Sequence, residues 1–285
     1  MHMATTLLDG THPTTPTRRS RVLLRGPRYS LHLTTRPEDV EAAQRLRHTV
    51  FSREPGFGTA MVGTVDGRDA DRFDDHCDHL LVRDDHADGA VVGCARVLTP
   101  DAAIAAGGLY GAGEFDLLEL APIAAETVEM GRACVLEGHR SGSVMALMWS
   151  GTLRYLDETG HRYVVGCTSV PVDPVDGTAP GAVIRGTRDL VRDRHRAAWQ
   201  VFPHRPVVIE GRRLDEIDPP PRLTLTPLMS GYLRIGARVC GEPAHDPDFG
   251  VGDFLTVLDK ETADRRYLER LRGLADRCEV AEVAR

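Results

Sequence analysis

The feature that most constrains the fold is a strand-like run that leads, through a short glycine-containing junction, into a helix-like run. Residues 127–136 are mostly apolar and carry two charges, Glu129 and Arg132. Residues 143–157 then place apolar side chains at the three- and four-residue spacing of one helix face. A strand and a helix of this kind bury their apolar surfaces against each other in a layered domain. We therefore expect a sheet with helices packed on it.

The same two periodicities alternate along the rest of the chain. Further strand-like segments are 29–34, 79–83, 90–98, 163–169 and 254–258, and further helix-like segments are 37–51, 183–199, 227–237 and 261–275. The helix at Pro37 is expected to be capped by Thr34 or Thr35. No internal repeat interrupts this order. The alternation predicts an α+β fold with a mixed sheet, mostly antiparallel and flanked by helices.

Length and composition bear on the domain organisation. The chain has 285 residues, of which 41% are apolar and 27% charged, typical of a globular protein with a sizeable core. Residues 1–27 are rich in Thr, Pro and Arg and lack apolar periodicity, which predicts a flexible basic tail. No clear linker follows. We expect residues 28–285 to form a single domain whose C-terminal part is a helical extension.

The charge is unevenly distributed. The formal net charge of −7 disfavours nucleic acid as a partner. Residues 17–28 nevertheless contain five arginines and no acid, and residues 185–196 contain five arginines against two aspartates. For the second segment two interpretations stay open. Its arginines either pair with Asp189 and Asp193 along one helix, or dock an acidic carrier protein or an anionic lipid surface.

Cysteines and apolar runs indicate the compartment. The six cysteines are scattered without a CxxC spacing, which favours a reducing cytoplasm. No segment has the length and hydrophobicity of a membrane span or of a secretory signal. In the acidic stretch of residues 71–78, His76 and the neighbouring His79 lack a third partner at zinc-binding spacing. No metal is expected, and a solvated acidic loop is the alternative for that stretch.

Glu129 and Arg132 are the first candidate catalytic residues. In a regular strand, residues three apart point to opposite faces of the sheet. A bulge at Gly131 would add one residue and return both charges to one face. The alternative is that Arg132 forms a structural ion pair while Glu129 is solvated.

The junction before the helix is a candidate anion site. Arg140, Ser141, Gly142 and Ser143 stand where a strand ends and a helix begins. Free backbone N–H groups at a helix N-terminus bind phosphate. An ordinary helix cap formed by one of the serines is the alternative.

Four short motifs occur in a characteristic order: Arg47-His-Thr-Val-Phe51, Asp71-Arg-Phe-Asp74, Gly93-Cys-Ala-Arg96 and Glu129-Met-Gly-Arg132. A longer block follows at residues 227–249. Together they resemble the GNAT-fold long-chain N-acyltransferases of the ornithine-lipid type, the L-ornithine Nα-acyltransferases, which are related to the acyl-homoserine-lactone synthases. The resemblance spans residues 29–259.

The resemblance implies a mechanism and a set of roles. A donor thioester lies between two diverging strands with its phosphate at residues 140–143, and an amine attacks it directly. By position, Glu129 is the expected base, and a strand N–H near Arg132 faces the oxyanion. The residues expected to shape the acceptor pocket are Arg47, Phe51, Arg96 and Arg132. Asp71 or Asp74 is expected to bind a distal ammonium.

We therefore expect an acyltransferase that moves a 3-hydroxyacyl chain from acyl carrier protein to the α-amine of ornithine or a similar amino acid, giving a lyso-ornithine-type lipid. No permanently bound cofactor is expected, because the acyl-phosphopantetheine thioester is the donor substrate. The expected location is the cytoplasm, with peripheral contact at the inner face of an anionic membrane. The alternatives are an acyl-homoserine-lactone or other N-acyl-amino-acid synthase, and a non-catalytic GNAT-like module that binds acyl carrier protein or membrane.

Overall fold

The computed structural model describes residues 19–54, 65–174 and 177–277. Its strands are β1 (Ser20–Arg25), β2 (Tyr29–Thr34), β3 (Asp78–Asp84), β4 (Ala90–Leu98), β5 (Phe115–Asp116), β6 (Thr127–Val135), β7 (Tyr163–Pro171), β8 (Arg196–Pro203), β9 (Val208–Ile209), β10 (Arg212–Arg213), β11 (Arg238–Gly241), β12 (Ala244–Asp246) and β13 (Val251–Asp259). Its helices are α1 (Pro37–Phe51), α2 (Pro100–Ala105), α3 (Ser143–Thr159), α4 (Ala182–Arg194), α5 (Pro227–Ile235) and α6 (Arg265–Arg277), with shorter 3₁₀ turns η2 (Val65–Gly67), η3 (Tyr110–Gly113), η4 (Leu118–Glu126) and η5 (Leu214–Glu216).

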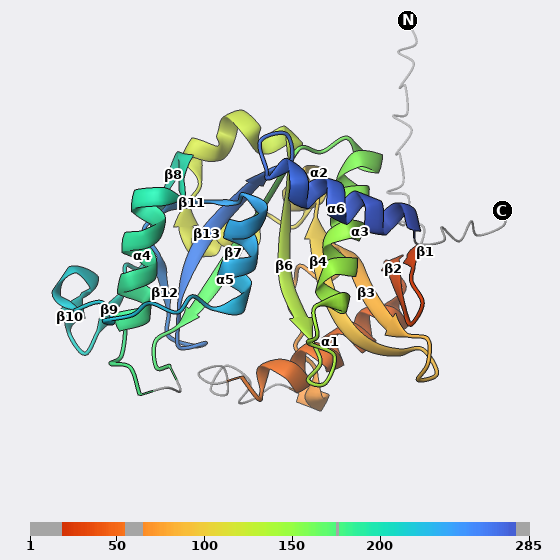
Figure 1. The fold of residues 1–285 in the computed structure, drawn as a ribbon, viewed down its shortest axis with the longest axis horizontal. Coiled ribbons are helices and arrows are strands. Elements are labelled where there is room, and N and C mark those ends of the chain that lie inside the picture. The colour runs from red at the N-terminus through yellow and green to blue at the C-terminus, as the bar shows by residue number, and fades with distance from the viewer. Residues whose placement is uncertain (1–18, 55–64, 175–176, 278–285) are drawn as a thin grey trace, which may run out of the picture.

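One eleven-stranded sheet runs through the molecule in the order β1-β2-β3-β4-β6-β7-β13-β11-β8-β5, with β12 paired to β13 (Figure 1). The pairs β6–β7 and β8–β11 are parallel, and the other pairs of this sheet are antiparallel. The predicted α+β fold with a mixed, mostly antiparallel sheet is confirmed.

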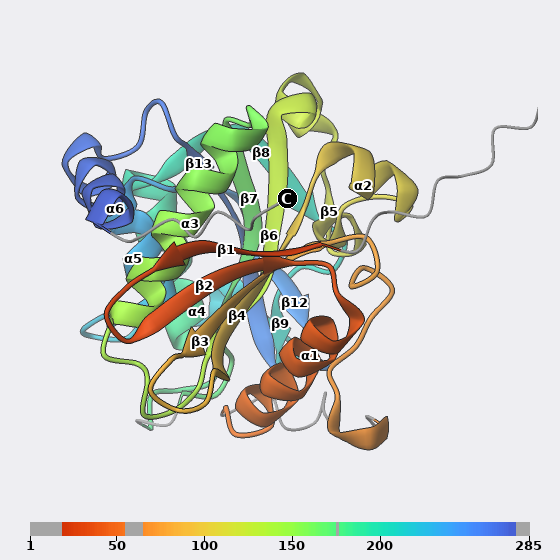
Figure 2. The same cartoon turned by 90° about the vertical axis from the view of Figure 1, so that its right-hand side faces the viewer.

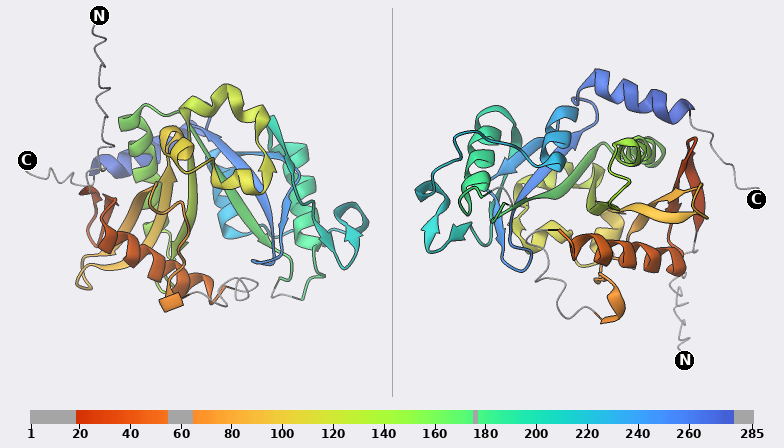
Figure 3. Two further views of the ribbon diagram at one scale, coloured as in Figure 1. Left: turned by 180° about the vertical axis from the view of Figure 1, so that it is seen from behind. Right: turned by 60° about the horizontal axis from the view of Figure 1, so that its bottom comes forward.

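Helices cover both faces of the sheet. Successive side chains of β7 point to opposite faces of the sheet: Val164 packs in the cluster that contains residues of α3, whereas Val165 packs with residues of η4. Figure 2 shows α1 and α3 on opposite sides of the sheet, and Figure 3 shows the segment from α2 to η4 on the same side as α1. We call the side with α1, α2, η3 and η4 the α1 face, and the side with α3, α4, α5 and α6 the α3 face.

Several predicted elements are wrong at their ends. Residues 20–25, expected to belong to a flexible tail, form edge strand β1, because Leu23 and Leu24 are fully buried against α3 while the arginines beside them reach solvent. Residues 1–18 of the expected tail lie outside the described residues. Helix α1 has Arg36, not Thr34 or Thr35, at its N-cap position, because the Thr34 hydroxyl donates to Asp39. The predicted helix 183–199 ends at Arg194, and residues 196–203 are β8.

Strand β6 contains the bulge that the charge spacing requires. Cys94 pairs with Cys134 and Arg96 with Gly131, so β6 carries one residue more than β4 between these pairs. The residue in the left-handed backbone conformation is Arg132, with φ 52°, rather than Gly131. The bulge places the side chains of Glu129, Arg96 and Arg132 together on the α1 face.

Strands β6 and β7 separate after a short parallel ladder. Their pairing joins Thr127 through Glu129 with Tyr163 through Val165 and then stops, while β6 continues along β4 and β7 along β13 (Figure 1). Gly166 marks the point of separation, since a Cβ there would lie 2.3 Å from the carbonyl oxygen of Met130. Only glycine allows this close approach.

Among the described residues, none of the helices has both the length and the apolar character required to cross a bilayer.

Candidate active site

Glu129 lies at the last pair before β6 and β7 separate. One carboxylate oxygen accepts a hydrogen bond from the backbone N–H of Tyr110 at 2.6 Å, and the other accepts one from Gly111 at 2.8 Å. The side chain is 5% exposed, and this burial raises its pKa above the ordinary value even though the two N–H groups favour the ionised form. A buried carboxylate of raised pKa, fixed in orientation, is suited to accept a proton.

Arg132 reaches the α1 face beside Glu129. Its guanidinium lies 5.3 Å from the ring centre of Tyr110 and 5.2 Å from that of Phe249. Its closest carboxylates, on Asp69 and Asp71, are each 3.6 Å away, too far for a hydrogen bond. The Nε atom is buried and has no hydrogen-bond partner among the described residues. Arg132 can therefore still bind an anion.

Arg47, Asp69, Asp74 and Arg96 form a buried ion-pair cluster, which we call the Asp74 network. Arg47 donates to both oxygens of Asp74, at 2.9 and 2.7 Å, and its Nε lies 2.9 Å from the carboxylate of Asp69. Arg96 donates to Asp74 at 3.0 Å. Burial alone would raise the pKa of Asp74, but the arginine hydrogen bonds hold it well below its usual range.

The Asp74 network uses up several residues that the sequence assigned to the acceptor pocket. Arg47 is 1% exposed and Asp74 is 4% exposed, and the two side chains form an ion pair with each other. Arg96 is equally buried, and it also donates to Asp71 at 2.6 Å. These three residues hold the pocket wall in place. They offer little to a ligand.

Of the two remaining residues expected in the acceptor pocket, Asp71 is partly exposed, whereas Phe51 is packed in an apolar cluster. Asp71 is partly exposed, and its Oδ2 atom has no hydrogen-bond partner among the described residues, so this oxygen faces Arg132 and remains available. Phe51 ends α1 and packs in an apolar cluster with Val50 and Cys94, against which Phe249 also packs. Through Phe249 it supports the surroundings of Arg132.

The predicted anion site lies at the start of α3. Gly142 occupies the N-cap position with φ 96°, and no side chain caps the helix, so the alternative of a serine cap formed by Ser141 or Ser143 is wrong. Arg140 donates to the carbonyl of Val135 and pairs with Glu54. The backbone N–H groups of the first helical turn, which follow Ser143, project from this end of the helix.

Three carboxylates that the sequence did not predict as site residues meet on the α1 face. Glu114 follows η3, Asp246 ends β12 and Asp253 lies in β13, and one oxygen of each lies within 4.8 Å of the others. We call them the acidic trio. Burial, followed by the charges of Asp253 and Asp246, raises the pKa of Glu114 to about 8, and burial raises that of Asp253 to about 6. The one available signal was Asp253, a lone acid within an apolar strand.

The acidic trio adjoins Glu129. A Cβ on Gly111 would lie 3.2 Å from Oε1 of Glu129 and 3.9 Å from Sγ of Cys167, and this sulfur is 3.7 Å from the carboxylate of Glu114. Asp246 also accepts hydrogen bonds from the backbone of the turn that holds Phe249 beside Arg132. Glu129, Arg132 and the acidic trio therefore lie around one part of the α1 face.

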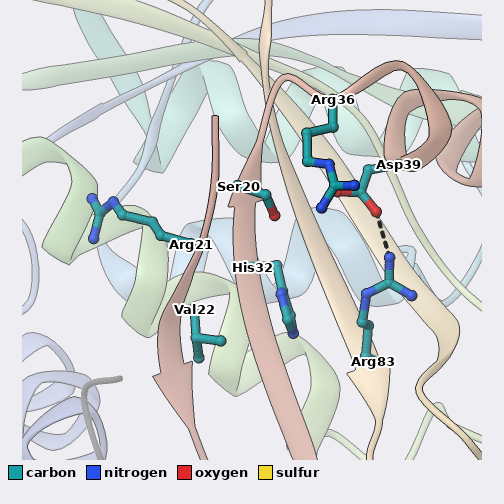
Figure 4. Close-up of a pocket in the computed structure, with 7 residues that line it drawn as sticks. All are labelled: Ser20, Arg21, Val22, His32, Arg36, Asp39 and Arg83. Carbon is teal, nitrogen blue, oxygen red and sulfur yellow. Dashed lines mark hydrogen bonds and ion pairs between the residues drawn. The ribbon is translucent and has the colours of Figure 1, made fainter. Parts of the chain in front are cut away.

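Two cavities lie away from these charges. One, of about 280 Å³, opens between β1, β2, β3 and the start of α1, where Arg83 pairs with Asp39 at 2.5 Å (Figure 4). None of its lining residues belongs to β6 or β7. The other, of about 10 Å³, is on the α3 face at the separation point and is lined by Met130 and Gly166 together with Trp149 and Tyr232. It is too narrow to hold an acyl chain unless these aromatic rings move.

The arginines of α4 are largely paired within the protein. Arg188 is 4% exposed in its side chain and binds Asp189, Asp215 and Glu242. Arg185 binds Asp189 at 2.7 Å and donates to the carbonyl of Leu214. The interpretation of this segment as internal pairing is confirmed for these two residues.

Comparisons with known proteins give a consistent result. Residues 46–150 match the acetyltransferase (GNAT) domain family. An L-ornithine N(alpha)-acyltransferase of Brucella abortus (strain 2308) is 33% identical over 250 residues, which is 84% of this chain and 86% of the relative. One of Rhizobium meliloti (strain 1021) is 32% identical over 260 residues, 87% of this chain and 86% of the relative. A solved CoA-dependent acyl-homoserine lactone synthase, BjaI, aligns with a TM-score of 0.47 at 16% identity, over 84% of this chain and 83% of that one.

Proposed function

The chain belongs to the L-ornithine N(alpha)-acyltransferase family, and from this membership we propose that it acylates the α-amine of ornithine to give a lyso-ornithine-type lipid. It is an acyltransferase with a GNAT-like α+β fold. The observation that carries the proposed chemistry is the position of Glu129, a buried carboxylate at the point where β6 and β7 separate, next to Arg132.

The proposed reaction begins with the donor thioester between β6 and β7 and its phosphate at the start of α3. Glu129 takes a proton from the α-ammonium of the acceptor, directly or through a water, and the free amine attacks the thioester carbonyl. The negative charge that develops on the carbonyl oxygen is met by a strand N–H near Arg132. Collapse of the intermediate breaks the C–S bond, so that one amide and one thiol are formed.

The acceptor is proposed to bind on the α1 face. The guanidinium of Arg132, whose Nε is free, suits a bidentate pair with the α-carboxylate of an amino acid. Asp71 lies 3.6 Å from this guanidinium and attracts it electrostatically. This arrangement directs the α-amine toward Glu129.

We propose a 3-hydroxyacyl group on acyl carrier protein as the donor. Two exposed arginines support a docking site for an acidic carrier: Arg53 follows α1, and Arg140 precedes α3 and pairs with Glu54. Reversal of Arg53 alone in Arg53→Glu is expected to raise KM for the carrier-bound donor and leave KM for a short pantetheine thioester unchanged, because Arg53 lies outside the phosphate-binding residues 140–143. Arg265→Glu, on the distant helix α6, is the matched control.

We also propose that the protein works in the cytoplasm in peripheral contact with an anionic membrane, because its product is an amphiphile. Leu118 and Phe202, which are 77% and 63% exposed, support this, since Phe202 pairs with Asp116, two residues from Leu118. Co-sedimentation with vesicles containing anionic lipid should fall in Leu118→Ser/Phe202→Ser. Unchanged sedimentation would contradict the contact at this surface.

Incubation with 3-hydroxyacyl carrier protein and a panel of amino acids, with thiol release and product mass as readouts, tests the function. Release with ornithine and an Nα-acyl product support the proposal. Release only with S-adenosylmethionine would instead identify a lactone synthase, and the absence of thiol release with every amine tested would identify a non-catalytic module. Glu129→Gln should fold normally and lose about 10²–10⁴-fold in kcat, less at high pH where more free amine is present. Full activity would assign Glu129 to structure.

A further inference from the structure

The acidic trio has no place in the reaction described so far. Three carboxylates of Glu114, Asp246 and Asp253 approach within 4.8 Å, although Asp253 is only 4% exposed. Gathering like charges away from water is costly unless a cation compensates them. The Asp74 network solves the same problem with two buried arginines, Arg47 and Arg96. Evidence for a ligand at the trio therefore has to come from its surroundings.

The surroundings of Arg132 supply that evidence. Its buried Nε atom has no hydrogen-bond partner among the described residues. The buried Oδ2 atom of Asp71, which lies 3.6 Å from the Arg132 guanidinium, also has none. Buried polar atoms without hydrogen bonds, collected around one guanidinium, point to a polar molecule that completes them. A positive pole at Arg132 and a negative pole at the trio thus flank Glu129.

We propose that the acidic trio binds the distal ammonium of the acceptor, so that it selects a diamino acid and determines which of the two amines is acylated. The inference rests on the proposed function, and it assigns to the trio the role that the family resemblance implied for Asp71 or Asp74. The oxygens of Asp74 are already held by Arg47 and Arg96. Asp71 pairs with Arg96 through one oxygen, and its other oxygen faces the guanidinium of Arg132 at 3.6 Å.

The spacing of the trio suits an ammonium group. An –NH₃⁺ group has three donors in a tetrahedral arrangement. Acceptors at about 2.8 Å from such a nitrogen are separated from one another by about 4.6 Å. The three carboxylate oxygens lie within 4.8 Å of one another, so one ammonium can bind all three at once.

The position of the trio accounts for regioselectivity. The distal amine, held as a cation by three carboxylates, is protonated and cannot attack the thioester. The α-amine is left near Glu129, which accepts a hydrogen bond from the backbone N–H of Gly111 beside the trio. Arg132 holds the carboxylate. An acceptor bound at both poles can present only its α-amine to the donor.

Ligand binding should also change the protonation of the trio. Without a ligand, the raised pKa values of Glu114 and Asp253 keep part of the trio protonated near pH 7. A bound ammonium favours the ionised form and expels protons. The titratable or charged groups that face the trio are Tyr110 of η3, Glu129 and Arg132 of β6, and Cys167 of β7. None of these is expected to gain a proton when the ammonium binds.

The test compares ornithine with norvaline, the same amino acid without the distal amine. In Asp253→Asn and Glu114→Gln, KM for ornithine should rise by about ten- to hundredfold while KM for norvaline stays constant. Asp116→Asn removes an exposed acid two residues from Glu114 and should change neither value. An unchanged ratio of kcat/KM for the two substrates in the trio variants would overturn the proposal. A proportional loss of kcat with both would reassign the trio to catalysis and overturn it too.

Two measurements on the unaltered protein cover the case in which the variants do not fold. Calorimetry in buffers of different ionisation enthalpy should detect protons released when ornithine binds at pH 7, but none with norvaline; equal release would contradict the proposal. EDTA should leave activity unchanged, whereas loss restored by Mg²⁺ or Mn²⁺ would identify the trio as a metal site. If neither amino acid is acylated, the proposed function itself fails; if both are acylated equally well, only the inference about the trio fails.

Discussion

The Asp74 network and the acidic trio lie on the same face of one sheet, yet they balance charge in opposite ways. In the network, two arginines and two aspartates pair with one another, and the pKa of Asp74 is lowered. In the trio, three acids meet, and the pKa of Glu114 is raised to about 8. Complete pairing stabilises the fold and leaves nothing for a ligand. In the trio no cation of the described residues balances the three acids in this way, and the raised pKa of Glu114 reflects it.

The largest effect should come from breaking the network. Arg47→Met leaves Asp74 and Asp69 buried without their main partner, so the free energy of unfolding should fall by about 3–5 kcal/mol. Urea denaturation measures it. Arg45→Met is the matched control on the same helix, because Arg45 is exposed and pairs with Glu41 at the surface; it should cost about 0.5 kcal/mol or less. Similar losses in both variants would mean that burial does not distinguish the two pairs.

The next effect has the opposite sign. Glu114→Gln removes one of three adjacent acids and should raise the free energy of unfolding at pH 8 by on the order of 2 kcal/mol. Thermal unfolding at pH 8 and pH 5 measures it, and the gain should vanish at pH 5, where the wild-type carboxyl is already protonated. A loss of stability at pH 8 would show that the trio is compensated in a way that the ion pairs do not reveal.

The pH profile of stability should separate the two regions. Because the folded pKa of Glu114 is raised, the native state binds more protons than the unfolded state between about pH 4.5 and about 8, and stability declines across this window. The folded pKa of Asp74 is lowered, so its contribution is present above the unfolded pKa and is lost as the pH falls below about 4. Asp74→Asn should flatten the acid limb alone. Glu114→Gln should flatten the neutral limb alone, and a change in both limbs by either variant would contradict their independence.

The smallest effect is expected at Asp71, which lies between the two regions. One of its oxygens pairs with Arg96, and the other has no hydrogen bond among the described residues. Asp71→Asn should change the free energy of unfolding by about 1 kcal/mol or less, since the asparagine Oδ1 can still accept from Arg96 and from the backbone N–H of Phe73. The same denaturation experiment measures it. A loss as large as that of Arg47→Met would place Asp71 within the network.

The sequence predicted regular elements well where periodicity was clear. The bounds of β2 and β4 are as predicted, and α3 begins at the predicted Ser143. Strand β1 was missed because its three apolar residues stand among arginines that look like a basic tail. Strand β8 was missed because it follows α4 after a single residue, His195, and continues its arginine pattern.

The sequence predicted only part of the site, because the pairing of its charged side chains depends on residues that are distant in sequence. Glu129 and Arg132 are close in sequence, so their spacing predicted that they share a face only if a bulge intervenes, and the structure contains that bulge. Whether an arginine such as Arg47 is already paired depends on contacts with distant residues, here Asp69 and Asp74. The acidic trio joins residues 114, 246 and 253, and no local pattern connects them.

The separation of β6 and β7 at Gly166 has a consequence for handling the protein. Beyond Glu129 and Val165 the two strands no longer pair with each other, so each has a stretch of backbone without a partner strand on that side in the described part of the chain. Open edges recruit other extended chains and promote aggregation. A donor whose arm contains amide groups can pair with these edges as an added strand does. Colloidal stability during purification should therefore improve with a non-reactive pantetheine amide, and short extended peptides should compete for the same edges.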